Sequence, residues 1–593
     1  MVTNLCGIIG YIGEKQALPV LQKGLKNLEY RGYDSIGMAT ISDSLNICKA
    51  IGTIDGAMRD LNQDMLEGRI GIGHTRWATH GGVSRENAHP HVDCQKRIAI
   101  VHNGIIENHR ELREELSGKG HNFASSTDSE VIAHLIEDNL REDANFESAC
   151  MAAFSRLRGS YAILAICEGE QKIVASRKDS PLVLGLIEDG LIFASDVSAL
   201  LEWTKRVVYL QNYDLAIAAN NRVVFRNLRL NKEVSREVSN VQWDMEQAKK
   251  GEFEHFMLKE IAEQAQTISR AIQQDEAVME NILQLVNKTE SVFLVGCGSS
   301  YHACLAGSYL FSQVARMNAN LVVASEFERY EQFLNKKSLV VAVSQSGETA
   351  DVLDVVRAAR ERKSKIIAIT NVIGSSLARE ADELLLMNSG PEICVLSTKT
   401  YTSQVVLMFL LAYCLAGKKE ECSRRIKGLY MDVYNLTSKS MREELKALAG
   451  VLAGREHIYM IGRGLQFATA KEAALKVKEV SYIHTEAFAG GELKHGPLAL
   501  IEERTPVFVF IGKENQEKTL SNAQEIKARG GMVICVSAIS QEIFDYWIKV
   551  PQCTDLNPVV QAIPLQILAY ELAVKKELNP DKPRNLAKCV TVL

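Results

Sequence analysis

The sequence has few features that would direct it to a membrane or to nucleic acid. Its formal net charge is only -5 at pH 7 over 593 residues, so neither nucleic acid nor an anionic membrane is expected as a partner. The N-terminus lacks a basic region followed by a long apolar core. The longest apolar run, residues 405–416, predicts a buried helix rather than a membrane span. We therefore expect a cytoplasmic protein.

The cysteines lack the spacing of a disulfide framework or of a metal site. There are thirteen, an odd number scattered along the chain, without a CxxC pair or Cys/His metal spacing. This usage fits a reducing compartment. With 46% hydrophobic and 24% charged residues, a chain of this length is expected to form three or four globular domains.

The most informative residue is Cys6, which Gly7 and Ile8 follow. A free α-amine, whose pKa lies near neutrality, can activate a cysteine thiol when that cysteine is the first residue of the mature chain. Five residues precede Cys6 in this sequence. A nucleophilic role for Cys6 therefore requires that its own amino group become free.

Further residues supply the other parts of an acyl-transfer site. Arg76 can hold a substrate carboxylate bidentately. Asn103 and Gly104 follow an apolar strand, and the Asn side chain with the Gly backbone N–H can stabilise a tetrahedral oxyanion. Asp128 can pair with a substrate ammonium. These residues predict acyl transfer from an amino-acid-like substrate.

Ordered motifs in the N-terminal part are Cys6-Gly7-Ile8, Leu28-Glu29-Tyr30-Arg31-Gly32-Tyr33-Asp34-Ser35, His74-Thr75-Arg76-Trp77-Ala78-Thr79-His80-Gly81, Ala88-His89-Pro90-His91 and His102-Asn103-Gly104-Ile105-Ile106-Glu107-Asn108. This set resembles the glutaminase half of the glutamine-fructose-6-phosphate aminotransferase family, also called glucosamine-6-phosphate synthases. The resemblance implies an N-terminal-nucleophile hydrolase with an αββα fold that releases ammonia from glutamine. It assigns catalysis to Cys6, Asn103 and Gly104. It assigns glutamine binding to Arg76, Trp77, His80 and Asp128.

The first five residues depart from that family, in which the cysteine directly follows the initiator methionine. Three explanations stay open. Translation starts at Leu5 from a UUG or CUG codon, a short propeptide is cleaved, or the extension persists. In the last case glutamine hydrolysis is disabled, and the chain is an ammonia-dependent sugar-phosphate aminating isomerase.

The C-terminal half contains an internal duplication. An apolar strand before Gly296-Cys297-Gly298 recurs before Gly462-Arg463-Gly464. Strands at 339–343 and 365–369 recur at 507–510 and 532–536. Short apolar strands separated by helical stretches predict parallel sheets that are covered on both faces.

One loop of the first copy has the composition of a phosphate site. Ser344-Gln345-Ser346-Gly347-Glu348-Thr349 follows the strand 339–343 and precedes a helical stretch at 350–362. Its hydroxyls and N–H groups would lie at the positive end of a helix. The second copy has Gly512-Lys513-Glu514-Asn515 instead, so we expect one sugar-phosphate site.

Three further motifs continue the family resemblance, as paired sugar isomerase domains: Ala474-Leu475-Lys476-Val477-Lys478-Glu479, Gly491-Glu492-Leu493-Lys494-His495-Gly496-Pro497 and Pro583-Arg584-Asn585-Leu586-Ala587-Lys588. The resemblance implies that Glu479 moves a proton between two sugar carbons, that His495 assists ring opening and that Lys588 forms a Schiff base with the ketose. It assigns sugar-phosphate binding to Gly298, Ser300, Ser344, Gln345, Ser346, Thr349, Val395, Ser397 and Lys476.

The expected fold class is α/β multidomain, with an N-terminal-nucleophile αββα domain and two doubly wound parallel-sheet domains. The expected parts are a glutaminase domain at 6–235, a linker at 236–270, isomerase domains at 271–435 and 436–580, and a C-terminal tail at 581–593. The resemblance implies glutamine and fructose 6-phosphate as substrates and a homodimer in which the His495 segment completes the neighbouring site. We expect no metal and no cofactor.

Other classes fit the sequence less well. Phosphoribosyl amidotransferases and asparagine synthetases share the glutaminase half, but this sequence lacks their acidic signature and Ser-Gly-Gly-Leu-Asp-Ser loop. A fructosamine-phosphate deglycase needs no glutaminase half. A phosphosugar sensor would be expected to lose Glu479 and Lys588, and both are present.

Overall fold

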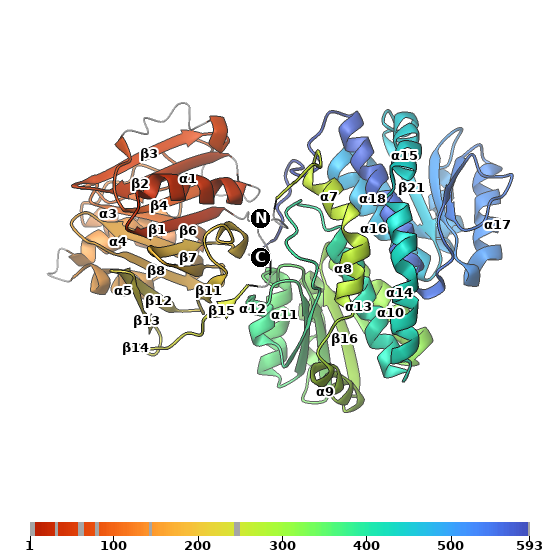
Figure 1. Ribbon diagram of the computed structural model, residues 1–593, viewed down its shortest axis with the longest axis horizontal. Coiled ribbons are helices and arrows are strands. Elements are labelled where there is room, and N and C mark those ends of the chain that lie inside the picture. Colours follow the sequence, from red (N-terminus) through yellow and green to blue (C-terminus); the bar gives the residue numbers. More distant parts are fainter. Residues whose placement is uncertain are drawn as a thin grey trace. The chain divides into compact units, whose positions relative to one another are not determined.

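The computed structural model in Figure 1 describes residues 6–29, 32, 34–56, 65–76, 82–140, 145–241, 243 and 249–590. The chain divides into two compact units. Residues 1–249, 348–350 and 587–593 form the first unit, and residues 250–347 and 351–586 form the second. Trp77 and His80, both predicted to bind glutamine, lie outside the described residues.

The described part of the first unit contains two antiparallel sheets. In the first sheet the strand order is β15 (Ser239–Asn240), β11 (Arg206–Tyr209), β9 (Val183–Ile187), β10 (Gly190–Ala194), β1 (Gly7–Gly13), β4 (Ile70–Arg76), β2 (Ser35–Ile41) and β3 (Leu45–Ile51). In the second sheet it is β14 (Lys232–Glu233), β13 (Arg222–Asn227), β12 (Asp214–Ala219), β8 (Ile173–Lys178), β7 (Gly159–Cys167), β6 (Ile98–Ile106) and β5 (His91–Val92).

Alternating side chains place these sheets face to face. Along β1, Ile8 and Ile12 join a core that also contains Leu164 of the second sheet, whereas Ile9 and Tyr11 pack with helix α1 (Ala17–Leu28) on the opposite face. The outer face of the second sheet packs against α3 (His109–Gly118), α4 (Glu130–Leu140) and α5 (Phe146–Ser155). The order helix, sheet, sheet, helix is the predicted αββα architecture (Figure 1).

The second unit contains two parallel sheets in the stretch 250–586. One has the order β17 (Asn320–Val323), β16 (Ser291–Gly296), β18 (Ser338–Val343), β19 (Lys365–Thr370) and β20 (Glu383–Leu386). The other has the order β22 (His484–Ala489), β21 (His457–Gly462), β23 (Pro506–Phe510), β24 (Met532–Ser537) and β25 (Tyr546–Lys549). The two orders correspond strand for strand, which confirms the predicted duplication.

Helices cover both faces of each parallel sheet. A large apolar core joins the two sheets to the helices α10 (Gly298–Leu310), α13 (Lys399–Leu415), α16 (Leu465–Ser481) and α18 (Asn557–Lys575). The opposite faces pack against α11 (Ala350–Glu361) and α17 (Gln516–Lys527). The unit also contains the helices α7 (Phe256–Ala262), α8 (Gln264–Ala271), α9 (Glu276–Asn287), α12 (Ser376–Glu380), α14 (Lys419–Leu436) and α15 (Lys439–Leu452).

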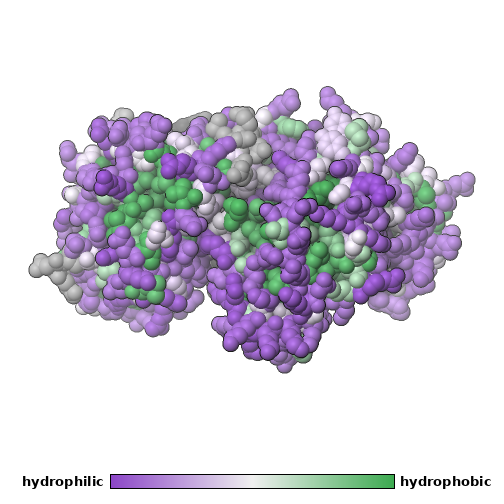
Figure 2. Space-filling view, turned by 60° about the horizontal axis from the view of Figure 1, so that its bottom comes forward, coloured by the Kyte–Doolittle hydropathy of each residue, from purple (hydrophilic) through white to green (hydrophobic). Residues whose placement is uncertain are grey.

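The apolar run at 405–416 forms most of α13, whose side chains are buried along nearly its whole length. A buried helix was predicted there, and the structure confirms it. Among the described residues, none of the helices has both the length and the apolarity needed to span a bilayer. The face drawn in Figure 2 is largely hydrophilic, with hydrophobic residues gathered in separate patches.

Candidate active sites

Cys6 directly precedes β1 and lies beside Asn103 of the neighbouring sheet. The Asn103 side-chain amide donates a hydrogen bond of 2.7 Å from Nδ2 to the carbonyl oxygen of Cys6. The next residue, Gly7, donates from its N–H to Thr75 Oγ1 at 3.1 Å. A Cβ atom at Gly7 would lie 2.5 Å from that oxygen, so only glycine fits. These contacts fix the backbone on which the Cys6 thiol is carried.

Asn103 and Gly104 occupy the middle of β6. Asn103 Oδ1 lies 3.1 Å from His74 Nε2, which orients the amide so that its NH2 group points to Cys6. Gly104 has φ of +129°, and a Cβ there would lie 2.1 Å from the carbonyl oxygen of Ser160. The strand therefore needs glycine at this position. The two residues predicted to bind the oxyanion are therefore neighbours on β6, and one of them, Asn103, also contacts Cys6.

Arg76 and Asp128 supply buried charges of opposite sign to this region. Arg76 ends β4, is 3% exposed and donates from Nη1 to the carbonyl of Gly82 at 3.2 Å. Burial lowers the pKa of the Arg76 guanidinium, while the negative charges of Cys6, Asp34 and Asp128 act in the opposite direction. Asp128 is 5% exposed, and its Oδ2 accepts a 2.8 Å hydrogen bond from Ile106 N–H.

Buried imidazoles support this arrangement. The rings of His74 and His89 stack with centroids 4.1 Å apart, and His102 Nδ1 lies 2.8 Å from Ser129 Oγ. Burial lowers the pKa of His74 to about 3 and also lowers that of His89 and His102, so these rings are neutral at pH 7. A neutral His74 can donate from Nε2 to the Asn103 oxygen, which holds the amide in place.

In the second unit, α16 carries the row Glu472, Lys476 and Glu479 along one face. Lys476 Nζ lies 2.7 Å from Glu479 Oε2 and 3.4 Å from Glu472 Oε1. Burial acts to lower the pKa of Lys476, but the two carboxylates outweigh it and the pKa is raised. Lys476 is therefore a buried cation that is held by two anions.

Helix α10 contributes partners to this row that sequence reasoning missed. Ser299 Oγ donates to Glu472 Oε1 at 2.9 Å and accepts from Lys476 Nζ at 3.1 Å. His302 Nδ1 lies 2.8 Å from Glu472 Oε2. The predicted residues Gly298 and Ser300 flank Ser299 at the start of α10. The only local sequence signal for Glu472 was its place one helical turn before Lys476.

The Ser344 loop connects β18 to the stretch that leads into α11. Ser344 Oγ accepts a hydrogen bond from Gly347 N–H at 3.1 Å, and the Gln345 carbonyl accepts from Asn371 N–H at 3.0 Å. Gly347 has φ of +67°, and a Cβ there would lie 2.1 Å from Ser375 Oγ. The loop is therefore a tight turn at the carboxyl end of a parallel strand. Ser346 belongs to this turn, and Thr349 immediately precedes α11.

A second loop holds Val395 and Ser397. Ser397 Oγ lies 2.6 Å from Thr400 Oγ1, and Val395 N–H donates to the Asp581 carbonyl at 3.1 Å. The buried carboxylate of Glu392 accepts hydrogen bonds from the N–H groups of Thr398 and Thr400 at 3.0 and 3.1 Å. Glu392 thereby fixes the backbone of this loop.

Two further predicted residues, His495 and Lys588, lie outside α16. His495 is exposed at the end of the short helix η6 (Glu492–His495). The tail before Lys588 is anchored, because Arg584 N–H donates to Tyr482 Oη at 2.7 Å. Beyond it, the Val590 carbonyl accepts from Ala350 N–H at 2.9 Å. Lys588 is half-buried between these anchors.

Parts of both units match the sequence models of known domain families. Residues 74–202 match the glutamine amidotransferase domain, and residues 284–413 and 451–576 match the SIS domain. A solved structure, the C-terminal domain of glucosamine-fructose-6-phosphate aminotransferase from Francisella tularensis, is 33% identical with a TM-score of 0.53. It covers 56% of this chain and 99% of its own.

Relatives match over the full length. The glutamine--fructose-6-phosphate aminotransferase (isomerizing) of Pyrococcus horikoshii is 44% identical over 99% of this chain and 100% of its own. That of Methanothermobacter thermautotrophicus is 43% identical over the same shares. With Cys6 beside Asn103 in one unit and Glu479 paired with Lys476 in the other, the chain belongs to the isomerizing glutamine-fructose-6-phosphate aminotransferase family.

Proposed function

We propose that this chain converts fructose 6-phosphate and glutamine to glucosamine 6-phosphate and glutamate, as its family does, through the two groups of residues described above. Ammonia is released from glutamine at the first and used at the second without leaving the enzyme. Transfer inside the protein keeps the nitrogen as ammonia, whereas in water at neutral pH most of it would become ammonium, which is not nucleophilic.

Cys6 is the nucleophile of the glutaminase reaction. Its thiolate attacks the side-chain amide carbon of glutamine and forms a thioester, which water then hydrolyses to glutamate. Asn103 Nδ2 already reaches the Cys6 carbonyl at 2.7 Å, and a second N–H on the same nitrogen remains to bind the oxyanion with the N–H of Gly104. Arg76 binds the α-carboxylate of glutamine and Asp128 its ammonium, and Trp77 and His80 complete that site.

The amination and isomerisation require a base and an electrophilic carbon. Lys588 condenses with the C2 ketone of the open-chain sugar, and ammonia replaces the lysine nitrogen. Glu479 then removes a proton from C1 and returns it to C2. The 2.7 Å contact between Lys476 Nζ and Glu479 Oε2 supports this role, because the buried lysine fixes the position of the carboxylate that acts as the base. His495 assists the opening of the sugar ring.

The sugar phosphate is held by the loops at the carboxyl ends of the first parallel sheet. Ser344, Gln345, Ser346 and Thr349 bind the phosphate, and the other sugar contacts come from Gly298, Ser300, Val395, Ser397 and Lys476. The support for this assignment is the turn closed by the Gly347 N–H bond to Ser344 Oγ, which precedes a helix N-terminus.

We propose that the mature chain begins at Cys6, because only then can its amine serve as the base for the thiol. Intact-mass analysis of the protein from its native host tests this. An intact mass equal to that of a chain starting at Cys6 supports the proposal. The mass of a chain starting at Met1 or Val2 contradicts it. In the latter case the chain forms glucosamine 6-phosphate from ammonium salts but not from glutamine.

We further propose a cytoplasmic homodimer. All thirteen cysteines lie in the described part of the chain and are thiols rather than disulfides, as expected for a reducing compartment. Met431 and Tyr434, one turn apart on α14, are 59% and 58% exposed, and His495 is exposed as well. An apolar helix face and an exposed site residue are what a second subunit would cover. Light scattering of the purified chain tests the dimer.

The observation that carries the proposed function is that one chain combines Cys6 held against Asn103 with the Glu479–Lys476 pair. The test is to measure glucosamine 6-phosphate formed from fructose 6-phosphate with either glutamine or an ammonium salt. We expect product with both when the chain begins at Cys6. Absence of product with both nitrogen sources would overturn the proposed function.

A further inference from the structure

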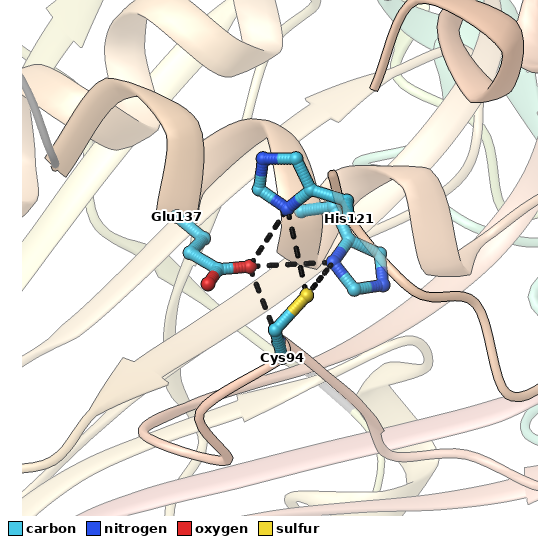
Figure 3. Close-up of side chains that lie close together, drawn as sticks. Cys94, His121 and Glu137 are labelled. Atoms are coloured by element: carbon cyan, nitrogen blue, oxygen red, sulfur yellow. Dashed lines mark hydrogen bonds and ion pairs between the residues drawn. The ribbon is translucent and has the colours of Figure 1, made fainter. Parts of the chain in front are cut away.

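Four side chains with metal-ligating atoms converge on one point in the first unit. They are Cys94, His121, His134 and Glu137, and their ligand atoms all lie within 4.8 Å of one another. Figure 3 shows the Cys94 sulfur, the Glu137 carboxylate and the two imidazoles turned toward one another. This cluster is separate from the residues to which the proposed reaction is assigned.

Three separate segments bring the cluster together. Cys94 lies in the loop between β5 and β6, and His121 follows the end of α3. His134 and Glu137 are one turn apart on α4, so they point to the same side of the helix. His121, His134 and Glu137 are each less than 5% exposed, whereas Cys94 is reached from solvent.

Four distances between the ligand atoms can be compared with the edges of a tetrahedral zinc site. Zinc bonds of 2.3 Å to sulfur and 2.0–2.1 Å to nitrogen give sulfur–nitrogen edges of about 3.6 Å in a tetrahedron. Cys94 Sγ lies 3.6 Å from His121 Nδ1 and 3.5 Å from His134 Nδ1. Glu137 Oε2 lies 2.9 Å and 3.4 Å from the same two nitrogens, near the nitrogen–oxygen edge of about 3.3 Å.

The outer nitrogens of both imidazoles face carboxylates. His121 Nε2 lies 3.5 Å from Asp138 Oδ1, and His134 Nε2 lies 3.6 Å from Glu130 Oε1. Histidines that bind metals usually direct their second nitrogen to such a carboxylate, which keeps the proton on that side. The lone pairs of both Nδ1 atoms then face the sulfur and the Glu137 oxygen. Once the Cys94 thiol loses its proton, these four atoms can bind one cation together, in place of the hydrogen bonds that the thiol and imidazole protons otherwise form.

We propose that Cys94, His121, His134 and Glu137 bind one Zn²⁺ ion. Mixed sulfur, nitrogen and oxygen ligands in a tetrahedron suit Zn²⁺, whereas Mg²⁺ and Ca²⁺ prefer oxygen ligands. Four protein ligands leave no open position for a substrate or a reactive water, so the ion is structural. It ties the β5–β6 loop to α4 and to the segment that leads into α4.

That segment carries Asp128, so the ion also steadies a residue of the proposed glutamine site. Glu130, which faces His134, accepts hydrogen bonds from Ala124 and Ser125 N–H, both at 2.7 Å. The ion, the Glu130 carboxylate and the loop before Asp128 thus form one connected structure. This consequence for glutamine binding rests on the proposed function, whereas zinc binding itself does not.

Sequence spacing did not indicate this site. The residues are spread over three segments, and the single short spacing among them is His134-x-x-Glu137. A cysteine and a histidine from distant segments become partners only through the packing of α4 on the second sheet. The expectation of no metal came from that lack of local spacing.

The test measures zinc in the purified full chain after dialysis against a weak chelator and equimolar zinc. We expect one zinc per chain in the wild type and in the controls C553S and H457Q, whose side chains lie outside the cluster. We expect C94S and H134Q to bind zinc at least tenfold more weakly. D138N should weaken binding by about 10- to 100-fold, because Asp138 only orients His121.

A second measurement uses only the wild-type chain and a control variant, so it remains informative if C94S or H134Q does not fold. The wild-type chain reconstituted with Co²⁺ should show the absorption of a thiolate–cobalt bond, and C553S should show it too. The proposal is overturned if wild-type protein retains no more zinc than C94S, or if its cobalt form lacks the thiolate band. Neither readout depends on activity, so either result is distinct from a failure of the proposed reaction.

Discussion

Lys476 Nζ lies 2.7 Å from Glu479 Oε2, one turn apart on the buried face of α16. The contact sets a carboxylate beside a buried ammonium group and fixes its position on the helix. A second carboxylate, Glu472, approaches the same lysine at 3.4 Å, so the cation is shared. The proposed isomerase site thus contains a buried positive charge that two carboxylates share.

Replacing Glu479 by glutamine should remove the proton shuttle while keeping the shape of the side chain. We expect E479Q to lower glucosamine 6-phosphate formation by about 10²- to 10⁴-fold with either glutamine or ammonium. Hydrolysis of glutamine to glutamate should persist, because that site lies in the other unit. E443Q, a substitution at an exposed residue of α15, is the control. Normal synthesis by E479Q would remove Glu479 from the mechanism.

Lys476 is expected to matter for stability as well as for catalysis. In K476M, Glu472 and Glu479 lose their buried cation, and this should destabilise the second unit by about 3–5 kcal/mol. K478M, two residues further along the same helix, changes an exposed lysine and should alter stability by less than about 0.5 kcal/mol. Urea unfolding midpoints of the two variants provide the comparison. Equal midpoints would mean that the buried cation contributes nothing.

Asn103 is expected to act only on the glutamine reaction. N103A loses the side-chain donor beside Cys6 and should reduce the glutaminase kcat by about 10²- to 10³-fold. Its rate with ammonium should stay close to that of the wild type, since the second unit is unchanged. A parallel loss of both activities would indicate that Asn103 serves the whole fold instead.

The buried imidazoles predict how the stability of the first unit depends on pH. Burial depresses the pKa of His89 far below the value near 6.5 expected in the unfolded chain, so the unfolded state binds the extra proton. The free energy of unfolding of the first unit is therefore highest above about pH 6.5. Below that pH it falls by up to about 1.4 kcal/mol per pH unit for each such ring.

The substitution H89F replaces the imidazole by an aromatic ring that cannot bind a proton. The unfolded chain then takes up one proton fewer as the pH is lowered. Among the described residues, neither ring nitrogen of His89 has a hydrogen-bond partner, so no bond is lost. The slope of stability against pH between about 4 and 6 should fall by about one proton relative to the wild type. Hydrogen exchange of peptides from β4 and β6 in graded urea measures it. H457F, at the exposed start of β21, should leave the slope unchanged.

The sequence predicted much of the fold, whereas the roles of the individual site residues stay predictions. The repeated apolar strands predicted both parallel sheets, because such strands carry their own periodicity. Cys6 and Asn103 were each recognisable from their neighbours. Their 2.7 Å contact was not, since it depends on the packing of two sheets.

Contacts between distant segments account for what sequence reasoning missed. Ser299 and Glu472 meet at 2.9 Å only because α10 packs on α16. The cluster of Cys94, His121, His134 and Glu137 likewise forms from three segments that the fold brings together. In both cases the residue types are ordinary, and their chemistry appears only when the partners are in place.

The central claim is that the nitrogen of the product comes from glutamine by way of Cys6. The most direct measurement supplies chains that begin at Cys6 with fructose 6-phosphate, glutamine labelled with ¹⁵N at the amide, and unlabelled ammonium. The wild type should yield glucosamine 6-phosphate that carries ¹⁵N, and C6A should yield only the unlabelled product. Labelled product from C6A at the wild-type rate would contradict the account.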